Sequence, residues 1–519
     1  MAHYFVGVDI GTYSSKGVLV RDDGTVVASQ VTPHALFMPQ PGWYEHDAEA
    51  TWWHDFVTIT RALLAQNRIV AREIAAVGVS SISPAIVPIS ADGDVLRPAI
   101  LYGIDTRATQ EIAEIEQALG GRDAFFQRYA MTLSAQSAAP KMRWIRTHEP
   151  AVWRATRLIL SGAGYIVWRL TGAATLDHYD ARAYAPLYDP ARLGWDATFA
   201  DLVAPVEWMA QPTWTCAIAG QVHAAAAAAT GLAAGTPVIT GTADAAAEAI
   251  SAGLAATGDM MIMYGSTVFF IVRTAQPPAS RRFWGAHFLE PGSYALAGGM
   301  ATAGSLTRWF RDTLGQAEMA AEAAGGANAY AALARLAGES APGAHGVLAL
   351  PYFAGERTPL NDPDARGLFI GLSLATTRAD LYRALLESVG YAICHNLHAM
   401  GSEGVTAQRI LAVGGGTLND LWMQMVSDIV GIEQRVPAQQ IGAAYGDAML
   451  AAVGAGYFAD SAAAVRAWVR SGRVITPDPA QHARYVPYYQ LYRTLYDQTA
   501  PAMHGLSRLQ AIAAAGATT

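Results

Sequence analysis

The sequence predicts an α/β protein with two domains and a cleft between them. The chain of 519 residues is too long for one hydrophobic core, and strand-like and helix-like segments alternate along it. A strand, a tight polar turn and a second strand occur early in each half, at residues 7–28 and 258–273. Two such hairpins suit a duplicated fold, so we expect domains over residues 1–250 and 251–480 and a C-terminal helix and tail over 481–519.

Composition and charge indicate a globular protein and argue against nucleic-acid-binding and membrane-spanning classes. Hydrophobic residues make up 52% of the chain and charged residues 15%, which is typical of a globular protein. The net charge of −8 and the lack of a Lys/Arg-rich run argue against a nucleic-acid partner. Cys216 and Cys394 have no zinc-site spacing and suit a reducing compartment. Residues 1–11 lack signal-peptide features and the Ala-rich stretch 224–256 is interrupted by polar residues, so we expect a cytoplasmic protein without a membrane span.

The first hairpin places chemically active side chains around one turn. Residues 4–10 and 16–20 have strand-like patterns, and Asp9, Thr12 and Lys16 flank the turn between them. A glycine lets backbone N–H groups approach an oxygen closely, while the carboxylate, hydroxyl and ammonium suit a metal-bound phosphate. An ordinary polar hairpin is the alternative interpretation.

Three further segments of the first half have clear patterns. Residues 74–82 and 157–163 are expected to be buried strands, and residues 50–67 have helical spacing. Over residues 234–253 a strand runs into a Gly-Thr turn that carries Asp244, and an Ala-rich helix follows. Asp244 is therefore expected at the end of a strand, where a side chain is accessible.

The second half repeats the arrangement and adds a glycine-rich turn. Its hairpin carries Gly265, Ser266 and Thr267 in the turn. Residues 378–400 predict a long core helix with Thr377 as N-cap. Residues 409–431 predict a strand, three glycines and a helix beginning near Asn419, an arrangement that suits a nucleotide because a helix start offers free N–H groups. No dinucleotide-binding, P-loop or protein-kinase motif occurs. Residues 485–506 predict a helix packed back on the fold.

With these features in order, the chain resembles the FGGY carbohydrate kinases of the actin-like ATPase superfamily, and among them the xylulokinase-like branch, from about residue 5 to 460. The segments that carry the resemblance are DIGTYSSKG (9–17), PGWYEHDAEATWW (41–53), LRPAILYGIDTRA (96–108), GTADAAAEA (241–249), MYGSTVFF (263–270), YFAGERTPLNDPDARGLFIGLS (352–373), GGGTLNDLWMQMVSD (414–428) and IGAAYGDAMLAA (441–452). The resemblance implies two actin-like (ribonuclease H-like) domains with a nucleotide and sugar cleft between them, and ATP with Mg²⁺ as cofactors.

The resemblance also implies roles for particular residues. Asp9 would help to hold Mg²⁺, directly or through water, because Mg²⁺ prefers one or two carboxylates plus phosphate oxygens and waters. The residues implied to contact ATP are Thr12 and Lys16 near the transferring phosphoryl group, Gly265, Ser266 and Thr267 as the second phosphate loop, and Gly415, Gly416 and Asn419 at the adenosine end. Asp244 matches the general base of the family, and its alternative role is to cap the helix that it precedes.

Sugar binding is implied for Ser83, Asp105 and Arg107 together with Asp244. For Asp105 and Arg107 a structural ion pair is the alternative. Glu45 and Asp47 are interpreted either as part of this region of the site or as a surface turn and a helix start, and Lys141 and Arg357 are left unassigned.

Two departures from the family pattern concern the sugar. Typical xylulokinases carry Gly-Gln-Met-His-Gly where this chain has SSISPAIVPIS at residues 80–90, and their Trp-Asn-Asp triplet is altered within YGIDTR at 102–107. The loss of the histidine suggests a different polyol, or one with fewer hydroxyls to recognise. The altered triplet removes an asparagine donor.

We therefore expect an ATP-dependent kinase that phosphorylates a terminal hydroxyl of a small ketose or polyol, D-xylulose first. The alternatives are another pentulose, a deoxy-pentulose or polyol, a catalytically weak sugar and ATP sensor, and an actin-like filament protein. A homodimer is possible because many relatives pair, although the sequence shows no exposed apolar helix stripe.

Overall fold

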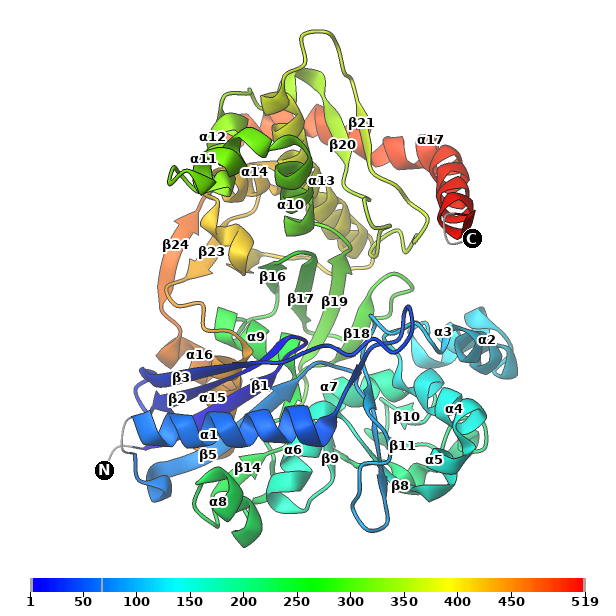
Figure 1. Ribbon diagram of the computed structural model, residues 1–519, viewed down its shortest axis with the longest axis vertical. Coiled ribbons are helices and arrows are strands. Elements are labelled where there is room, and N and C mark those ends of the chain that lie inside the picture. The colour runs from blue at the N-terminus through cyan, green and yellow to red at the C-terminus, as the bar shows by residue number, and fades with distance from the viewer. Residues whose placement is uncertain (1–2, 67–68, 517–519) are drawn as a thin grey trace.

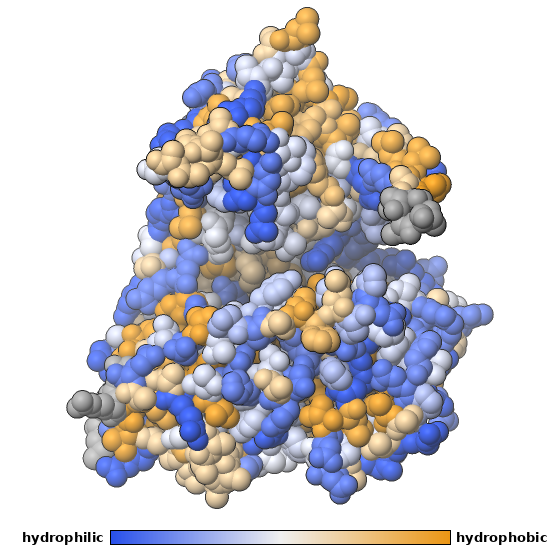
Figure 2. Space-filling view, in the orientation of Figure 1, coloured by the Kyte–Doolittle hydropathy of each residue, from blue (hydrophilic) through white to orange (hydrophobic). Residues whose placement is uncertain are grey.

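The computed structural model describes residues 3–66 and 69–516 and consists of two α/β bodies, one above the other in Figure 1. The first half of the chain forms most of the lower body and the second half most of the upper one (Figure 1). The predicted α/β class with two bodies is thus confirmed. Figure 2 shows the molecule hollowed between them.

The lower body is built on a mixed sheet with strand order β13-β14-β5-β1-β2-β3, and β15 also pairs with β5. Its strands are β1 (Tyr4–Ile10), β2 (Ser14–Arg21), β3 (Val26–Pro33), β5 (Ile74–Ser81), β13 (Ile218–Gln221), β14 (Pro237–Ile239) and β15 (Thr242–Ala243). β1 pairs antiparallel with β2 and parallel with β5. Since Phe5, Val6, Val8 and Ile10 are all inaccessible to solvent, β1 is a central strand covered on both faces.

The upper body has a second mixed sheet with strand order β18-β19-β17-β16-β22-β23-β24. Its strands are β16 (Asp259–Tyr264), β17 (Val268–Thr274), β18 (Trp284–His287), β19 (Tyr294–Met300), β22 (Arg409–Val413), β23 (Gln434–Pro437) and β24 (Ser471–Ile475). β16 pairs antiparallel with β17 and parallel with β22, as β1 does with β2 and β5. The two hairpins expected from the sequence therefore occupy equivalent places in the two sheets.

Shorter strands and a set of helices surround the sheets. The remaining strands are β4 (Glu45–His46), β6 (Val87–Ser90), β7 (Ala99–Ile100), β8 (Thr156–Leu160), β9 (Thr175–Asp177), β10 (Tyr188–Asp189), β11 (Gly194–Trp195), β12 (Gln211–Thr213), β20 (Leu348–Leu350) and β21 (Leu368–Ile370). The helices of the first half are α1 (His54–Gln66), α2 (Thr109–Ala118), α3 (Arg122–Tyr129), α4 (Ala138–His148), α5 (Pro150–Ala155), α6 (Gly162–Thr171), α7 (His178–Ala181), α8 (Ala224–Thr230) and α9 (Asp244–Ala252). Those of the second half are α10 (Gly304–Leu314), α11 (Gln316–Ala323), α12 (Ala329–Gly338), α13 (Arg378–Ser402), α14 (Asp420–Val430), α15 (Ala443–Gly454), α16 (Ser461–Trp468) and α17 (Pro479–Gly516).

The two halves of the chain are interlocked by α15. This helix belongs to the second half, yet it packs on β1 and β5 of the lower sheet and on α9. The close approach depends on glycine: a Cβ atom on Gly7 would lie 1.9 Å from the carbonyl oxygen of Ala444, and one on Gly446 would lie 1.9 Å from that of Ala247. The domains expected from the sequence are consecutive segments, so they did not include a helix of the second half that packs on the first sheet.

Most of the predicted elements are observed, with small shifts at their ends. Thr377 caps α13 as expected, with Asp380 completing the capping box. The predicted strand at 157–163 ends at Leu160 because α6 begins at Gly162, capped by Ser161. The predicted helix at 50–67 begins earlier, as a π-helical turn over Ala48–Trp53 that leads into α1, and residue 67 lies outside the described residues.

The C-terminal helix α17 packs back on the upper body, as predicted, through buried tyrosines that include Tyr485 and Tyr492. The expectation of no exposed apolar stripe is wrong for its end, because Leu506, Leu509 and Ile512 are 55%, 63% and 68% exposed. Figure 2 shows this hydrophobic surface beside the C-terminus. Among the described helices, none combines the length and apolarity that crossing a membrane requires.

Candidate active site

A cavity of about 580 Å³ lies between the two bodies. The side chains that line it from the lower body include Asp9, Ser83, Asp180, Asp244 and Glu248, and those from the upper body include Ser266, Thr267, Phe269, Trp284 and Arg357. A smaller cavity of about 330 Å³, between the β2–β3 turn and α16, contains none of the predicted site residues among the described residues that line it. Of the predicted site residues, Asp9, Ser83, Asp244, Ser266 and Thr267 line the larger cavity, whereas the others, Thr12 and Lys16 among them, are not among its described lining residues.

Asp9 lies near the end of β1, beside Ser80 of β5 and opposite Lys16 of β2. The Ser80 hydroxyl is 3.1 Å from Asp9 Oδ1 and 2.8 Å from Oδ2 of Asp447 on α15. Since one hydroxyl carries one proton, both bonds form together only when one of the two carboxyls is itself protonated. Burial raises the pKa of both groups, and the nearby Asp244 and Glu248 raise that of Asp9 further.

Asp244 is the first residue of α9 and follows β15, which pairs with β5. Its Oδ1 accepts a hydrogen bond of 2.7 Å from the Ala245 N–H, and within the described part of the chain its Oδ2 has no hydrogen-bond partner. Burial raises the pKa of Asp244 to about 6. The N-cap of α9 is Ala243, with no side-chain cap, so Asp244 does not cap the helix as the alternative expected; it is the first residue of the helix and lines the cavity.

The first hairpin brings Lys16 and Thr12 close to these carboxylates. The Lys16 ammonium donates to the carbonyl of Ile441 in the second half, and its charge lowers the pKa of both Asp9 and Glu248. Burial outweighs that effect in Glu248 and raises its pKa to about 7. The Thr12 hydroxyl lies 3.1 Å from the Tyr102 hydroxyl.

The second hairpin lies on the opposite side of the cavity. The backbone carbonyl of Ser266 accepts from the N–H groups of Ala303 and Ser305 at 2.9 and 3.0 Å, which fixes the turn against the start of α10. Ser266 and Thr267 line the cavity, and Gly265 closes the turn by donating to the carbonyl of Thr267 at 3.0 Å.

Gly415, Gly416 and Asn419 follow β22, the strand beside β16. Gly416 leaves room for Tyr264, because a Cβ there would lie 2.7 Å from Tyr264 Cβ. Asn419 caps α14 by accepting from the Trp422 N–H at 3.0 Å. None of the three is among the described residues that line the cavity; they lie at an accessible edge of the same sheet, next to the second hairpin.

Ser83 lies just beyond β5, and its hydroxyl donates to Oδ1 of Asp180 on α7. Both residues line the cavity. Asp180, Glu248 and Asp447 were not among the predicted site residues. For Asp447 a signal existed, since it is an acidic residue in the small and apolar run IGAAYGDAMLAA.

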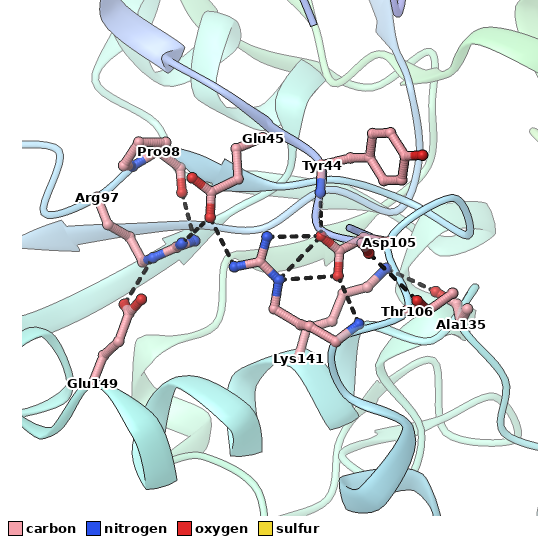
Figure 3. A network of polar contacts seen from close by, with 11 residues as sticks. Tyr44, Glu45, Arg97, Pro98, Asp105, Thr106, Ala135, Lys141 and Glu149 are labelled. Carbon is pink, nitrogen blue, oxygen red and sulfur yellow. Dashed lines mark hydrogen bonds and ion pairs between the residues drawn. The ribbon is translucent and has the colours of Figure 1, made fainter. Parts of the chain in front are cut away.

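Asp105 and Arg107 form a buried ion pair, the alternative considered from the sequence (Figure 3). The Arg107 guanidinium donates to Asp105 from Nε at 3.0 Å and from Nη2 at 2.7 Å, and from Nη1 to Glu45 at 2.7 Å. Both side chains are inaccessible to solvent, and neither is among the described residues that line the cavity. The structural ion pair considered from the sequence is therefore present.

The neighbouring acidic and basic residues belong to the same network. Glu45 is buried between Arg97 and Arg107 and is not in a surface turn, whereas Asp47 does begin a helix, by accepting from the N–H groups of Glu49 and Ala50. The Lys141 ammonium donates to the carbonyl of Ala135 at 2.7 Å, and burial lowers its pKa to about 7 (Figure 3). The other unassigned residue, Arg357, lines the cavity.

Comparison with known proteins places this geometry in a family. The model of the FGGY family of carbohydrate kinases, N-terminal domain, matches residues 4–251, and that of the C-terminal domain matches residues 260–455. The xylulose kinase of Escherichia coli (strain K12) is 30% identical over 505 residues, which cover 96% of this chain and 100% of that protein. The chain belongs to the FGGY family of carbohydrate kinases.

Solved structures of similar proteins agree with this assignment. The crystal structure of a xylulose kinase from Rhodospirillum rubrum is 34% identical, with a TM-score of 0.89 and coverage of 97% of this chain and 100% of that one. A gluconate kinase from Lactobacillus acidophilus has a TM-score of 0.87 at 21% identity and shows a shared fold alone. The predicted actin-like fold is thus confirmed, and this FGGY kinase is a phosphotransferase that uses ATP.

Proposed function

We propose that this FGGY kinase transfers the γ-phosphoryl group of ATP to a terminal hydroxyl of D-xylulose. The proposed substrate is the one named for relatives that align with nearly the whole chain, among them the xylulose kinases of Bacillus subtilis (strain 168) and Escherichia coli (strain K12). The observation that supports the chemistry is Asp244, which lines the cavity and whose Oδ2 has no hydrogen-bond partner within the described residues. A base in that place accepts the proton of a hydroxyl that attacks phosphorus from within the cavity.

In the proposed mechanism, Asp244 orients the attacking hydroxyl and removes its proton as the bond to phosphorus forms. Its pKa of about 6 leaves it mostly ionised at neutral pH and still basic enough to take a proton. Phosphoryl transfer depends chiefly on alignment and on neutralised charge. We assign Thr12 and Lys16 of the first hairpin and Gly265, Ser266 and Thr267 of the second to the phosphates, because Tyr13 of the first turn and Ser266 and Thr267 of the second line the same cavity.

We also propose that Asp9 takes part in a Mg²⁺ site. Its Oδ2 has no hydrogen-bond partner within the described residues, and the side chain lines the cavity, so one carboxylate is available beside the position proposed for the phosphates. One carboxylate suits Mg²⁺, which fills the rest of its coordination with phosphate oxygens and waters. When bound, the ion neutralises charge on the phosphoryl group. We assign Gly415, Gly416 and Asn419 to the adenosine end, where an open turn meets the start of α14.

We make three further proposals, on the domain boundaries, the cellular location and the oligomeric state. We assign the domains to residues 1–250 and 251–480 with a C-terminal helix and tail over 481–519, in line with the spans of the two family models. The use of ATP and the unpaired Cys216 and Cys394 suit a cytoplasmic location. The exposed apolar end of α17 suits contact with a second copy of the chain, and light scattering coupled to gel filtration would give the mass of a dimer that Leu509→Lys reduces to the mass of a monomer.

The test of the function is ADP release by purified protein with ATP, Mg²⁺ and a panel of pentuloses, deoxy-pentuloses, tetritols, glycerol and hexonates. We expect D-xylulose to give the highest kcat/KM, and EDTA to abolish turnover. If another sugar of the panel gave the highest kcat/KM, the proposed mechanism would stand and that sugar would replace D-xylulose as the proposed substrate. No sugar-stimulated release across the panel would refute the proposal.

A further inference from the structure

Asp180 is a buried carboxylate in the cavity wall to which no role has been assigned so far. It lies on α7 and is 4% exposed. Its Oδ1 accepts a hydrogen bond from the Ser83 hydroxyl. Within the described part of the chain, Oδ2 has no hydrogen-bond partner, and the residue lines the cavity. This oxygen is not among the described side-chain atoms that are fully enclosed and lack a partner, so it is accessible to a hydrogen-bond donor that a ligand brings into the cavity.

The neighbouring Asp177 shows what a purely structural carboxylate looks like in the same segment. It is 2% exposed. Its Oδ1 accepts from the Asp180 N–H at 3.0 Å, and its Oδ2 accepts from the hydroxyls of Thr215 and Thr242 at 2.9 and 2.6 Å. Asp177 is not among the described residues that line the cavity. Every oxygen of Asp177 is therefore used by the fold, whereas one oxygen of Asp180 is left for the cavity.

The surroundings of Asp180 suit a hydroxyl of the substrate. Burial raises the pKa of Asp180 most, the charge of Asp177 raises it further, and the charge of Asp244 adds to this, so the two carboxylates in the cavity wall interact through their charges. No arginine or lysine forms an ion pair with Asp180 within the described residues. Much of the rest of the wall is apolar, including Ile104, Met131 and Trp284. A neutral O–H donor fits such a place, since an anion would be repelled by both carboxylates.

We propose that Asp180, oriented by Ser83, accepts a hydrogen bond from a sugar hydroxyl other than the one that is phosphorylated, and so determines which ketose is accepted. This inference rests on the proposed function, because it assumes that a polyhydroxylated substrate enters the cavity with its reacting hydroxyl at Asp244. A site that bonds a hydroxyl discriminates strongly against a substrate that lacks it. In this chain the Ser83–Asp180 pair supplies that discrimination.

The test compares kcat/KM for D-xylulose with kcat/KM for pentuloses that each lack one hydroxyl, at C1, C3 or C4. In the wild type we expect one of these analogues to be disfavoured roughly 10- to 100-fold, the effect of one hydrogen bond to a charged group. In Asp180→Ala that ratio should fall close to one, mainly through KM, while the other two ratios stay unchanged. Asp180→Asn should give an intermediate ratio, since an amide keeps one acceptor.

Asp177→Asn is the matched control, because it is equally buried and one turn away. It should lower the melting temperature and leave all three ratios at their wild-type values. Ser83→Ala should weaken the same single ratio as Asp180→Ala and serves as the second variant if Asp180→Ala does not fold. The proposal would be overturned if the kcat/KM ratios in Asp180→Asn and Ser83→Ala equalled those of the wild type. It would also be overturned if these variants lost kcat/KM equally for every sugar.

Sugar binding without ATP, measured by calorimetry, separates this inference from the proposed function. Wild-type protein that binds a pentulose without turning it over would refute the function but still test Asp180, through the dissociation constants of the same sugars. Loss of discrimination in those constants would support the inference, and its retention in the variants would overturn it. Wild-type protein that neither binds nor phosphorylates any member of the panel would overturn both.

Discussion

Two groups of buried or partly buried acidic residues in the lower body differ in how their charge is compensated. Glu45 and Asp105 are enclosed by guanidinium groups, and Arg107 donates to both. Asp180 is also buried and Asp244 is partly buried, but each has a carboxylate oxygen without a partner within the described residues. The first group holds loops together, and the second lines the cavity. From this difference we infer that an uncompensated carboxylate, and not burial itself, marks the side chains proposed to act on the substrate.

The largest effect that would test this contrast is the loss of Asp244. We expect Asp244→Ala and Asp244→Asn each to lower kcat by roughly 10²- to 10⁴-fold, because neither side chain can accept the proton of the attacking hydroxyl. ADP release at saturating sugar measures it. The melting temperature should not fall, since a carboxylate held by a single backbone N–H bond is removed. A variant with more than a tenth of the wild-type kcat would contradict the assignment.

The opposite behaviour is expected in the compensated group. Arg107→Met leaves Asp105 without its guanidinium partner in a solvent-free environment, and should lower the free energy of unfolding by about 3 to 5 kcal/mol. Urea denaturation measures the loss, and kcat per folded molecule should stay near that of the wild type. As a control, Arg107→Met combined with Asp105→Asn should recover part of the stability. A selective rise in KM for the sugar without a loss of stability would instead place Arg107 in the sugar site.

The pH dependence of turnover sharpens the contrast on the cavity side. Because Asp244 must be ionised to act as a base and its pKa is raised to about 6, kcat/KM should increase as pH rises through about 6 and level off above it. Measurement from pH 5 to 8 at constant ionic strength tests this. A profile that stays flat over that range would show that proton removal by Asp244 does not limit the reaction.

The smallest expected effect concerns Lys141, at the edge of the compensated group (Figure 3). Its pKa is lowered to about 7 by burial, so the folded protein favours the neutral amine, while in the unfolded chain lysine stays charged up to about pH 10. The wild type should therefore lose stability as pH falls from about 10 to 7. Lys141→Met should raise the melting temperature by roughly 2 °C at pH 7 and by less at pH 10. A difference that is independent of pH would show that the lysine is charged in the folded state.

Local patterns in the sequence determined a large part of the fold and of the candidate site. The strand–turn–strand patterns of residues 7–28 and 258–273 gave both hairpins, since alternation and turn residues act over a few positions. Thr377 began its helix because a capping box is a local hydrogen-bond pattern. Asp244 was found because a glycine and a threonine precede it at the end of a strand. Each of these signals is complete within one short segment.

Only the tertiary structure decided which polar residues lie together. The Asp-x-Arg spacing of Asp105 and Arg107 is the same whether the pair binds sugar or closes on itself, and the choice depends on Glu45, 62 residues away from Arg107. Asp180 joins the cavity through Ser83, 97 residues away, and Asp447 reaches Ser80 because α15 crosses into the other body. The sequence by itself thus determined the elements and the turn chemistry, which depend on near neighbours. Burial and pairing of charges depend on long-range packing, and so only the folded chain decided which carboxylates are compensated and which remain free to act.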